Sequence, residues 1–198
     1  MNLEEYKGVF VYAQQVDGEL SGIALELLGK ARDLAKDLDT NVTAVLVGAD
    51  VKGLCDKLAE YGADRVIVVE DPELKEYRTE PYTHALASVI NEYKPEIMLV
   101  GATAIGRDLG PRVSARVATC LTADCTMLEI GDLPLNRLPN QEQKHNQLLM
   151  TRPAFGGNTI ATIACPDNRP QMATVRPGVM QKIAPIADAK AEIIEYNP

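Results

Sequence analysis

The chain is short of aromatic residues, positive charge and long apolar runs, and each shortage excludes a class of protein. Its 198 residues include no Trp and only two Phe, which argues against an aromatic platform for single-stranded nucleic acid. Its 28 acidic residues outnumber its 20 basic ones, so no basic surface for nucleic acid is expected. No apolar run has membrane-spanning length, and no signal peptide is evident at the start. We therefore expect an acidic cytoplasmic protein with no nucleic-acid partner and no membrane insertion.

Residues that commonly build catalytic and metal sites are equally scarce. The two histidines, His84 and His145, are far apart in the sequence, and none of the three serines lies in a GxSxG motif. We therefore predict neither a catalytic residue nor a metal site. The cysteines form no CxxC pair, which argues against zinc or thioredoxin-like chemistry. We expect all four to be buried, reduced thiols, as is usual in the cytoplasm; they are Cys55, Cys120, Cys125 and Cys165.

Strand-like and helix-like segments alternate regularly up to Thr119. Short runs of β-branched and other apolar residues predict strands, and apolar residues at helical spacing predict helices between them. This alternation predicts an α/β fold with a doubly wound, mostly parallel sheet in three layers. The predicted strands are 8–13, 42–47, 65–69 and 97–100, and the predicted helices begin after Ser21 and Asp50, span 79–93, and end near Thr119.

Four residues in this part carry local predictions. Ser21 and Asp50 are expected to cap the first two helices at their N-termini. Gly62 suits the left-handed position that follows the second helix. Pro111 is tolerable if it lies in the first turn of the helix that follows the fourth strand.

The pattern changes after Thr119. Residues 131–147 are polar and interrupted by proline, which predicts a surface loop or a partly ordered excursion. Short apolar runs before and after it predict an antiparallel or mixed extension of the sheet near the C-terminus, and one further strand ends the chain. These predicted strands are 122–130, 148–151, 159–164, 172–175 and 191–196.

The segment 101–112 (GATAIGRDLGPR) lies where a parallel sheet commonly binds ligands, because it directly follows the fourth strand. A helix N-terminus with Arg107 and Arg112 could hold a phosphate. The segment matches neither common phosphate-binding motif, however. We favour a strand-to-helix turn whose Arg107 and Asp108 pair with neighbouring residues or with another subunit.

The segment 150–180 combines Gly, Pro and Arg with strand-like runs, a composition suited to close approach of a partner. Gly156 and Gly157 remove side chains where a backbone or a ligand could come near. Arg152, Arg169 and Arg176 each precede a proline, which restricts the local chain.

Arg152 has the most suggestive context of these three arginines. Its cation could lie over a flavin ring and stabilise negative charge on that ring as it is reduced. Equally, Arg152 could pair with one of the many carboxylates of the chain. For Asp124 and Cys125, we expect roles in pairing or packing.

Three motifs, in order, resemble the alpha subunit of electron-transfer flavoproteins. They are GATAIGRDLGPRVSARVATCLTADCT, TRPAFGGN and RPQMATVRPGVM, and the resemblance extends over residues 8–196. It implies a cytoplasmic or mitochondrial heterodimer with a beta subunit, which carries electrons between flavin dehydrogenases of the acyl-CoA dehydrogenase type and other acceptors. It also implies FAD as the cofactor of the heterodimer, and an electron carrier rather than a self-sufficient catalyst.

The second and third motifs look more like the versions found in anaerobes, including electron-bifurcating members. In that group, the arginine that matches Arg152 approaches the flavin of the beta subunit, so the resemblance makes Arg152 the one expected cofactor-binding residue. The FAD domain of the family would begin soon after residue 198. The resemblance therefore implies an amino-terminal α/β domain at 1–185, with the final strand and the start of a linker at 186–198.

Two alternatives from other functional classes remain. A stand-alone nucleotide-binding module, similar to universal stress proteins, would bind AMP or ATP tightly without a partner, although the chain lacks a glycine-rich phosphate loop. A hydrolase or ligase that uses Arg107 would need a nucleophile or base, and the sequence offers no convincing one.

Overall fold

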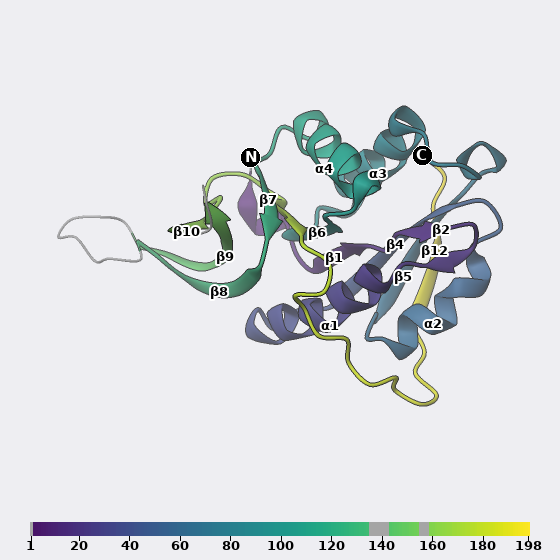
Figure 1. Ribbon diagram of the computed structural model, residues 1–198, viewed down its shortest axis with the longest axis horizontal. Coiled ribbons are helices and arrows are strands. Elements are labelled where there is room, and N and C mark those ends of the chain that lie inside the picture. The colour runs from purple at the N-terminus through teal and green to yellow at the C-terminus, as the bar shows by residue number, and fades with distance from the viewer. Residues whose placement is uncertain (1, 135–142, 155–158) are drawn as a thin grey trace.

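The computed structural model describes residues 2–134, 143–154 and 159–198. A sheet of seven parallel strands lies at its centre (Figure 1), in the order β12-β5-β4-β1-β6-β11-β7. Strands β4 and β5 lie on one side of β1 and β6 lies on the other, so the sheet is doubly wound, as predicted. The strands are β1 (Val9–Tyr12), β4 (Val42–Gly48), β5 (Arg65–Glu70), β6 (Ile97–Gly101), β7 (Leu121–Cys125), β11 (Gln171–Val175) and β12 (Glu192–Glu195).

Alternate residues of the strands build two cores, one on each face of this sheet. Val9 and Val11 pack in the core that includes residues of α1 and α2, whereas Phe10 and Tyr12 pack in the core that includes residues of α3 and α4. The helices thus cover both faces and give the predicted three layers (Figure 1). The α-helices are α1 (Gly22–Asp37), α2 (Cys55–Glu60), α3 (Thr79–Tyr93) and α4 (Ala104–Arg116), and short 3₁₀ turns span Leu3–Glu5, Lys52–Leu54 and Pro72–Leu74.

The chain after Thr119 divides between two sheets. Strands β8 (Met127–Leu133), β9 (Lys144–Ala154) and β10 (Thr159–Ile163) form a separate antiparallel sheet, which is the predicted extension. Strand β11, however, is a parallel strand between β6 and β7, so the prediction that residues 172–175 belong to the extension is wrong. All five residues of β11 are buried, as is typical of a strand inside a parallel sheet.

Two further boundaries differ from the prediction. The predicted strand 122–130 is two strands, because Asp124 has a positive φ and Thr126 donates its N–H to the carbonyl of Thr151 in the other sheet. The predicted loop 131–147 is partly strand, since β8 and β9 extend into it from both sides. A two-stranded hairpin of β2 (Gln15–Val16) and β3 (Glu19–Leu20) follows β1.

The last strand, β12, pairs in parallel with β5 at the far edge of the main sheet, which confirms the strand predicted there. The chain reaches it by crossing over the outside of α1 and α2 (Figure 1). A Cβ at Gly29 of α1 would lie only 2.5 Å from the carbonyl of Gln181, and Ile186 donates its N–H to the carbonyl of Glu60 at the end of α2. This crossing segment is therefore packed closely onto the helices.

The local predictions met different outcomes. Ser21 is the N-cap residue of α1, but its hydroxyl donates to the carbonyl of Gln14 rather than capping the helix. Asp50 is not a cap. The Glu70 carboxylate accepts from the N–H of Val51, 2.7 Å away, so a residue distant in the sequence binds the free N–H at the start of the Lys52–Leu54 turn. Gly62 has φ +108° after α2, as predicted.

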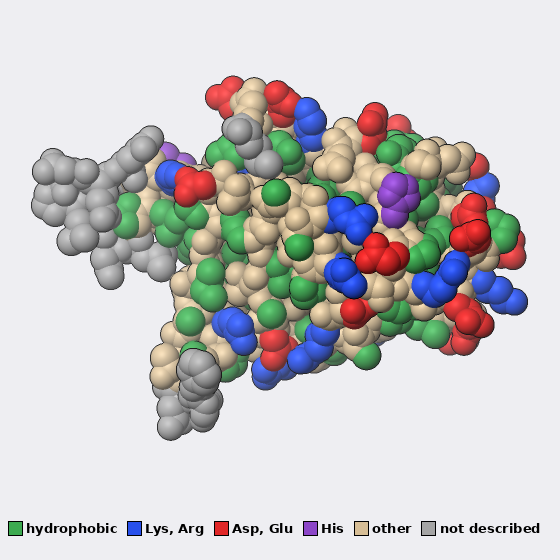
Figure 2. Space-filling view, turned by 90° about the horizontal axis from the view of Figure 1, so that it is seen from above, with side chains coloured by type: hydrophobic (Ala, Val, Ile, Leu, Met, Phe, Trp, Pro, Cys, Tyr) green, Lys and Arg blue, Asp and Glu red, His purple; other side chains and the backbone are tan. Residues whose placement is uncertain are grey.

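Pro111 lies well inside α4 rather than in its first turn. The helix begins earlier than expected because Thr103 caps it: the Thr103 hydroxyl accepts from the N–H of Gly106, 3.0 Å away. Basic and acidic side chains are interspersed on the face seen in Figure 2, with no gathering of positive charge there. Among the described residues, no helix combines the length and the apolar character needed to cross a membrane.

Candidate functional site

The carboxyl ends of β1 and β6 form the switch point of the sheet, where doubly wound folds commonly bind ligands. Here the chain closes this point with its own groups. The Thr103 hydroxyl donates to the side-chain oxygen of Gln14 across 2.7 Å. Gly106 packs so tightly that a Cβ would lie 1.8 Å from the carbonyl oxygen of Gly101. Neither Gln14 nor Thr103 was anticipated from the sequence, although Thr103 precedes a helix and could have been recognised as its cap.

The residues of the 101–112 segment pair with their neighbours, as favoured from the sequence. Arg107 donates to the carbonyl of Ala102 at 3.0 Å and to the Asp124 carboxylate at 3.3 Å. Asp108 accepts from the hydroxyls of Tyr77 and Thr79, each 2.6 Å away. These bonds commit both side chains to contacts within the chain.

Asp124, at the carboxyl end of β7, is the centre of an arginine cluster. Arg176 donates two hydrogen bonds to its carboxylate, at 3.2 and 2.7 Å, and Arg107 donates a third. The Asp124 N–H donates to the Thr174 hydroxyl at 2.9 Å, which fixes its backbone. The bonds from Arg176 hold the pKa of Asp124 below its usual value, and the charges of Arg107 and Arg152 add to that effect. The pairing role expected for Asp124 is confirmed.

Arg152 lies beside this cluster on β9, opposite Ala161 of β10. The side chain is half-buried, and its charge acts on both Asp124 and Cys125. Yet no hydrogen bond or ion pair joins the side chain of Arg152 to any other residue that the structure describes. Arg107, Arg152 and Arg176 together outnumber the single carboxylate of Asp124, so this group of four side chains carries excess positive charge.

An open hollow of about 240 Å³ adjoins Arg152. Apart from the guanidinium, apolar side chains line it, so a partner ring that entered it would meet one cation against an apolar wall. The lining residues are Arg152, Pro153, Ala154, Ala161 and Ile163.

Arg169, also singled out from segment 150–180, lies apart from the arginine cluster. Arg169 is 5% exposed and donates to the carbonyls of Cys165 and Asn168, with Glu96 3.8 Å away. Arg169 therefore has a structural role and is not part of the arginine cluster around Asp124. Gly156 and Gly157 lie outside the described residues.

Cys125 packs beneath the arginine cluster, as expected. Burial raises the pKa of its thiol to about 12, and the nearby charge of Arg152 acts in the opposite direction. A thiol with such a pKa stays protonated at neutral pH, so Cys125 has a packing role.

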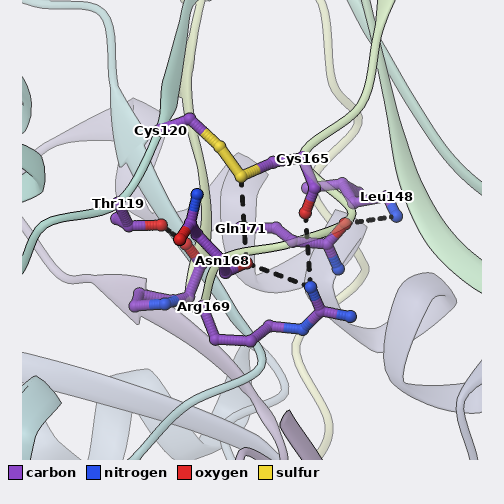
Figure 3. The surroundings of a disulfide bond; sticks show 8 residues. Thr119, Cys120, Leu148, Cys165, Asn168, Arg169 and Gln171 are labelled. Atoms are coloured by element: carbon purple, nitrogen blue, oxygen red, sulfur yellow. Dashed lines mark hydrogen bonds between the residues drawn. A yellow bond between two sulfur atoms is a disulfide. The ribbon is translucent and has the colours of Figure 1, made fainter. Parts of the chain in front are cut away.

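The expectation of four buried, reduced cysteines is wrong for one pair. Cys120 and Cys165 form a disulfide (Figure 3), with Cα atoms 6.4 Å apart, and Cys120 is exposed. The expectation holds for Cys55 and Cys125, which are free and buried. The disulfide escaped detection because its residues are 45 positions apart. Only the fold brings the turn before β7 next to the connection before β11.

Comparison with known proteins gives one consistent result. The family described as Electron transfer flavoprotein domain matches residues 9–198. "Protein FixB" of Clostridium saccharobutylicum is 51% identical over all of this chain and 56% of its own length. "Electron transfer flavoprotein subunit alpha" of Clostridium acetobutylicum is 49% identical over 96% of this chain and 53% of its own length.

A third relative, "Lactate dehydrogenase (NAD(+),ferredoxin) subunit LctC" of Acetobacterium woodii, is 43% identical over 86% of this chain and 38% of its own length. The chain thus spans about half the length, or less, of the curated relatives it matches. Since the family match covers nearly every residue and the similarity to alpha subunits is close to one residue in two, the chain belongs to the electron-transfer flavoprotein family and is similar throughout to its alpha subunits.

Proposed function

We propose that this chain works in a heterodimeric, cytoplasmic electron-transfer flavoprotein, where it scaffolds the beta subunit and borders that subunit's flavin or nucleotide with Arg152. One observation carries the site. The Arg152 side chain lines an apolar hollow beside a cluster rich in positive charge, and it makes no hydrogen bond or ion pair with another described residue. The names of the relatives support the role in electron transfer.

The residues of the hollow fit the edge of a flavin ring held by another subunit. Their apolar side chains suit a ring surface, and the guanidinium suits a group that gains negative charge. FAD, when bound in the complex, would supply the electron-accepting ring. Arg152 would supply a positive charge to that ring, and β9 and β10 would hold its backbone in register through the pairing of Arg152 with Ala161.

Asp124 would tune this charge indirectly. Because its carboxylate is already shared by Arg176 and Arg107, it is poorly placed to neutralise Arg152 as well. The cluster thus keeps the charge of Arg152 available to a partner.

The relatives also suggest partner enzymes. One is named "Acryloyl-CoA reductase electron transfer subunit beta", from Anaerotignum propionicum, and is 43% identical over 91% of this chain. The printed name of LctC joins NAD with ferredoxin. On these grounds we propose an acyl-CoA dehydrogenase-type flavoenzyme as the docking partner, and electron bifurcation as the mode of action.

The test replaces Arg152 with Ala and with Lys in the complex formed by co-expression with a beta subunit. Loss of a nearby charge worth about 1 kcal/mol should lower the one-electron reduction potential of the partner's flavin by roughly 40 mV. The Lys variant should retain part of the effect. Arg112→Ala, on the exposed surface of α4 where Arg112 pairs with Glu80, controls for the change in net charge.

Three outcomes would contradict the proposal. Flavin potentials and electron-transfer rates that are the same in all variants would remove the role of Arg152. Flavin bound equally well by this chain with and without the beta subunit would remove the scaffold role. Tight AMP or ATP binding by the isolated chain in calorimetry would favour a stand-alone nucleotide module instead.

A further inference from the structure

The Cys120–Cys165 disulfide has one accessible end and one buried end. Cys120 is exposed in the turn before β7, whereas Cys165 is 3% exposed in the connection between β10 and β11. In thiol–disulfide exchange a thiolate attacks the sulfur that it can reach, and the other sulfur leaves. The fold therefore assigns Cys120 as the attacked sulfur and Cys165 as the leaving group.

The two remaining cysteines do not compete with this pair. Cys55 and Cys125 are buried and free. Burial raises the pKa of Cys55 and takes that of Cys125 to about 12, so neither forms an appreciable amount of thiolate at neutral pH. Redox chemistry at this protein's cysteines is thus directed to one pair.

The disulfide joins the turn before β7 of the main sheet to the connection that leaves β10 of the smaller sheet, and Figure 3 shows the residues around it. Beside Cys120, the Thr119 hydroxyl donates to the carbonyl of Pro170 at 2.7 Å. Beside Cys165, Arg169 donates to the carbonyls of Cys165 and Asn168 at 3.3 and 3.0 Å. The Arg169 bonds hold the connection before β11 together, and the covalent bond reinforces the Thr119–Pro170 contact that joins this connection to the turn before β7.

The same joint bounds the candidate site. Cys165 comes two residues after the end of β10, which pairs with β9 where Arg152 lies opposite Ala161. Cys120 comes four residues before Asp124. The disulfide therefore links the segment that leads to Asp124 with the connection that follows the strand paired with Arg152.

We propose that Cys120–Cys165 is a redox modification site, at which small-molecule thiols and their disulfides open and close the covalent link between the two sheets. In the opening step, a thiolate forms a bond to the Cys120 sulfur while the bond to Cys165 breaks. The electron pair stays on Cys165, which takes up a proton. A second thiol then attacks the mixed disulfide and releases Cys120 as a thiol. Two small thiols are oxidised to one disulfide, and two cysteines are reduced. This inference requires neither a flavin nor a beta subunit.

The test equilibrates the purified chain with glutathione and glutathione disulfide at a series of ratios, followed by alkylation and mass spectrometry. We expect one two-electron transition that involves Cys120 and Cys165 alone, while the protein remains folded. On reduction, amide hydrogen exchange in residues 164–168 should rise at least about tenfold, with no change in β4. Cys55→Ala should leave the transition unchanged. Cys120→Ser, at an exposed position that tolerates substitution, should abolish it.

Each contrary result overturns the proposal. A disulfide between two chains would place the chemistry elsewhere. Alkylation of Cys120 in the air-oxidised protein would show that the pair does not form. Reduction only after unfolding would make the bond purely structural. Equal hydrogen exchange in both redox states would show that the bond does not hold the joint.

Discussion

Interior strands of the main sheet and the edge strand β10 of the smaller sheet use apolar residues in opposite ways, although Leu128, Leu148 and Met150 of β8 and β9 are buried in the main core. In β4, β6 and β11 every residue is buried. In β10, by contrast, Ile160 is 71% exposed and Ile163 is 40% exposed, and Met127 of β8, at the opposite edge of the same sheet, is 45% exposed. Buried strands of the first kind stabilise the fold, whereas exposed apolar side chains add little to stability and are available to a partner.

Polar groups follow the same division. At the switch point of the main sheet, Gln14 and Thr103 are bonded to each other. In the smaller sheet, the side chain of Arg152 makes no hydrogen bond or ion pair with another described residue. At the switch point, polar groups of the chain are thus bonded to one another, whereas the Arg152 side chain beside the hollow of the smaller sheet is available to a partner. If that division is real, substitutions in the two regions must differ in kind.

Gly106→Ala should have the largest effect on stability. Its Cβ would lie 1.8 Å from the backbone carbonyl of Gly101, and this carbonyl has little room to move because Gly101 is buried and paired with Val175 of β11. We expect a loss of at least about 3 kcal/mol in the free energy of unfolding, measured by denaturant titration. Gly53→Ala is the control, because nothing lies within 4 Å of its Cβ position. A tolerated Gly106→Ala would show that α4 does not pack as described.

Leu99→Ala against Ile160→Ala tests the two sheets directly. Leu99 is fully buried in β6, so truncation should cost about 2–5 kcal/mol of unfolding free energy. Ile160 is mostly exposed, so the same kind of truncation should cost less than about 0.5 kcal/mol. Thermal unfolding of both variants measures the difference. Similar losses at the two positions would refute the division between a stabilising sheet and an exposed one.

Asp124→Asn should have a smaller effect that depends on pH. Because the arginines lower the pKa of Asp124 in the fold, its contribution to stability is present above the unfolded-state pKa and is lost as pH falls through the folded-state value. We expect a loss of about 1–2 kcal/mol at pH 7 that disappears in the acid range below about pH 4. Asp33→Asn, at a side chain 73% exposed, is the control. A loss that is constant with pH would argue against ion pairing.

Much of the fold was predictable because its signals are local. The runs 42–47 and 97–100 became strands β4 and β6, and the helix predicted at 79–93 has those bounds as α3. Such segments depend on apolar periodicity and β-branching, which neighbouring residues carry. The errors lie where a distant residue decides. The Glu70 carboxylate accepts from the turn that Asp50 was expected to cap, and β11 pairs with β6 and β7, two strands that lie far from it in the sequence.

By itself, the amino-acid sequence determined the α/β class, the parallel strands before Thr119 and the resemblance to electron-transfer flavoproteins. It also favoured contacts of Arg107 and of Asp108 with neighbouring residues. The tertiary structure alone decided that Cys120 bonds to Cys165 and that Asp124 accepts from Arg107 and Arg176. It also decided that the Arg152 side chain lies beside them without a hydrogen bond or ion pair to another described residue. The physical reason is range. Backbone preference and apolar spacing act over a few residues, whereas a disulfide or a charge cluster forms only where the sheet brings together segments far apart in the chain.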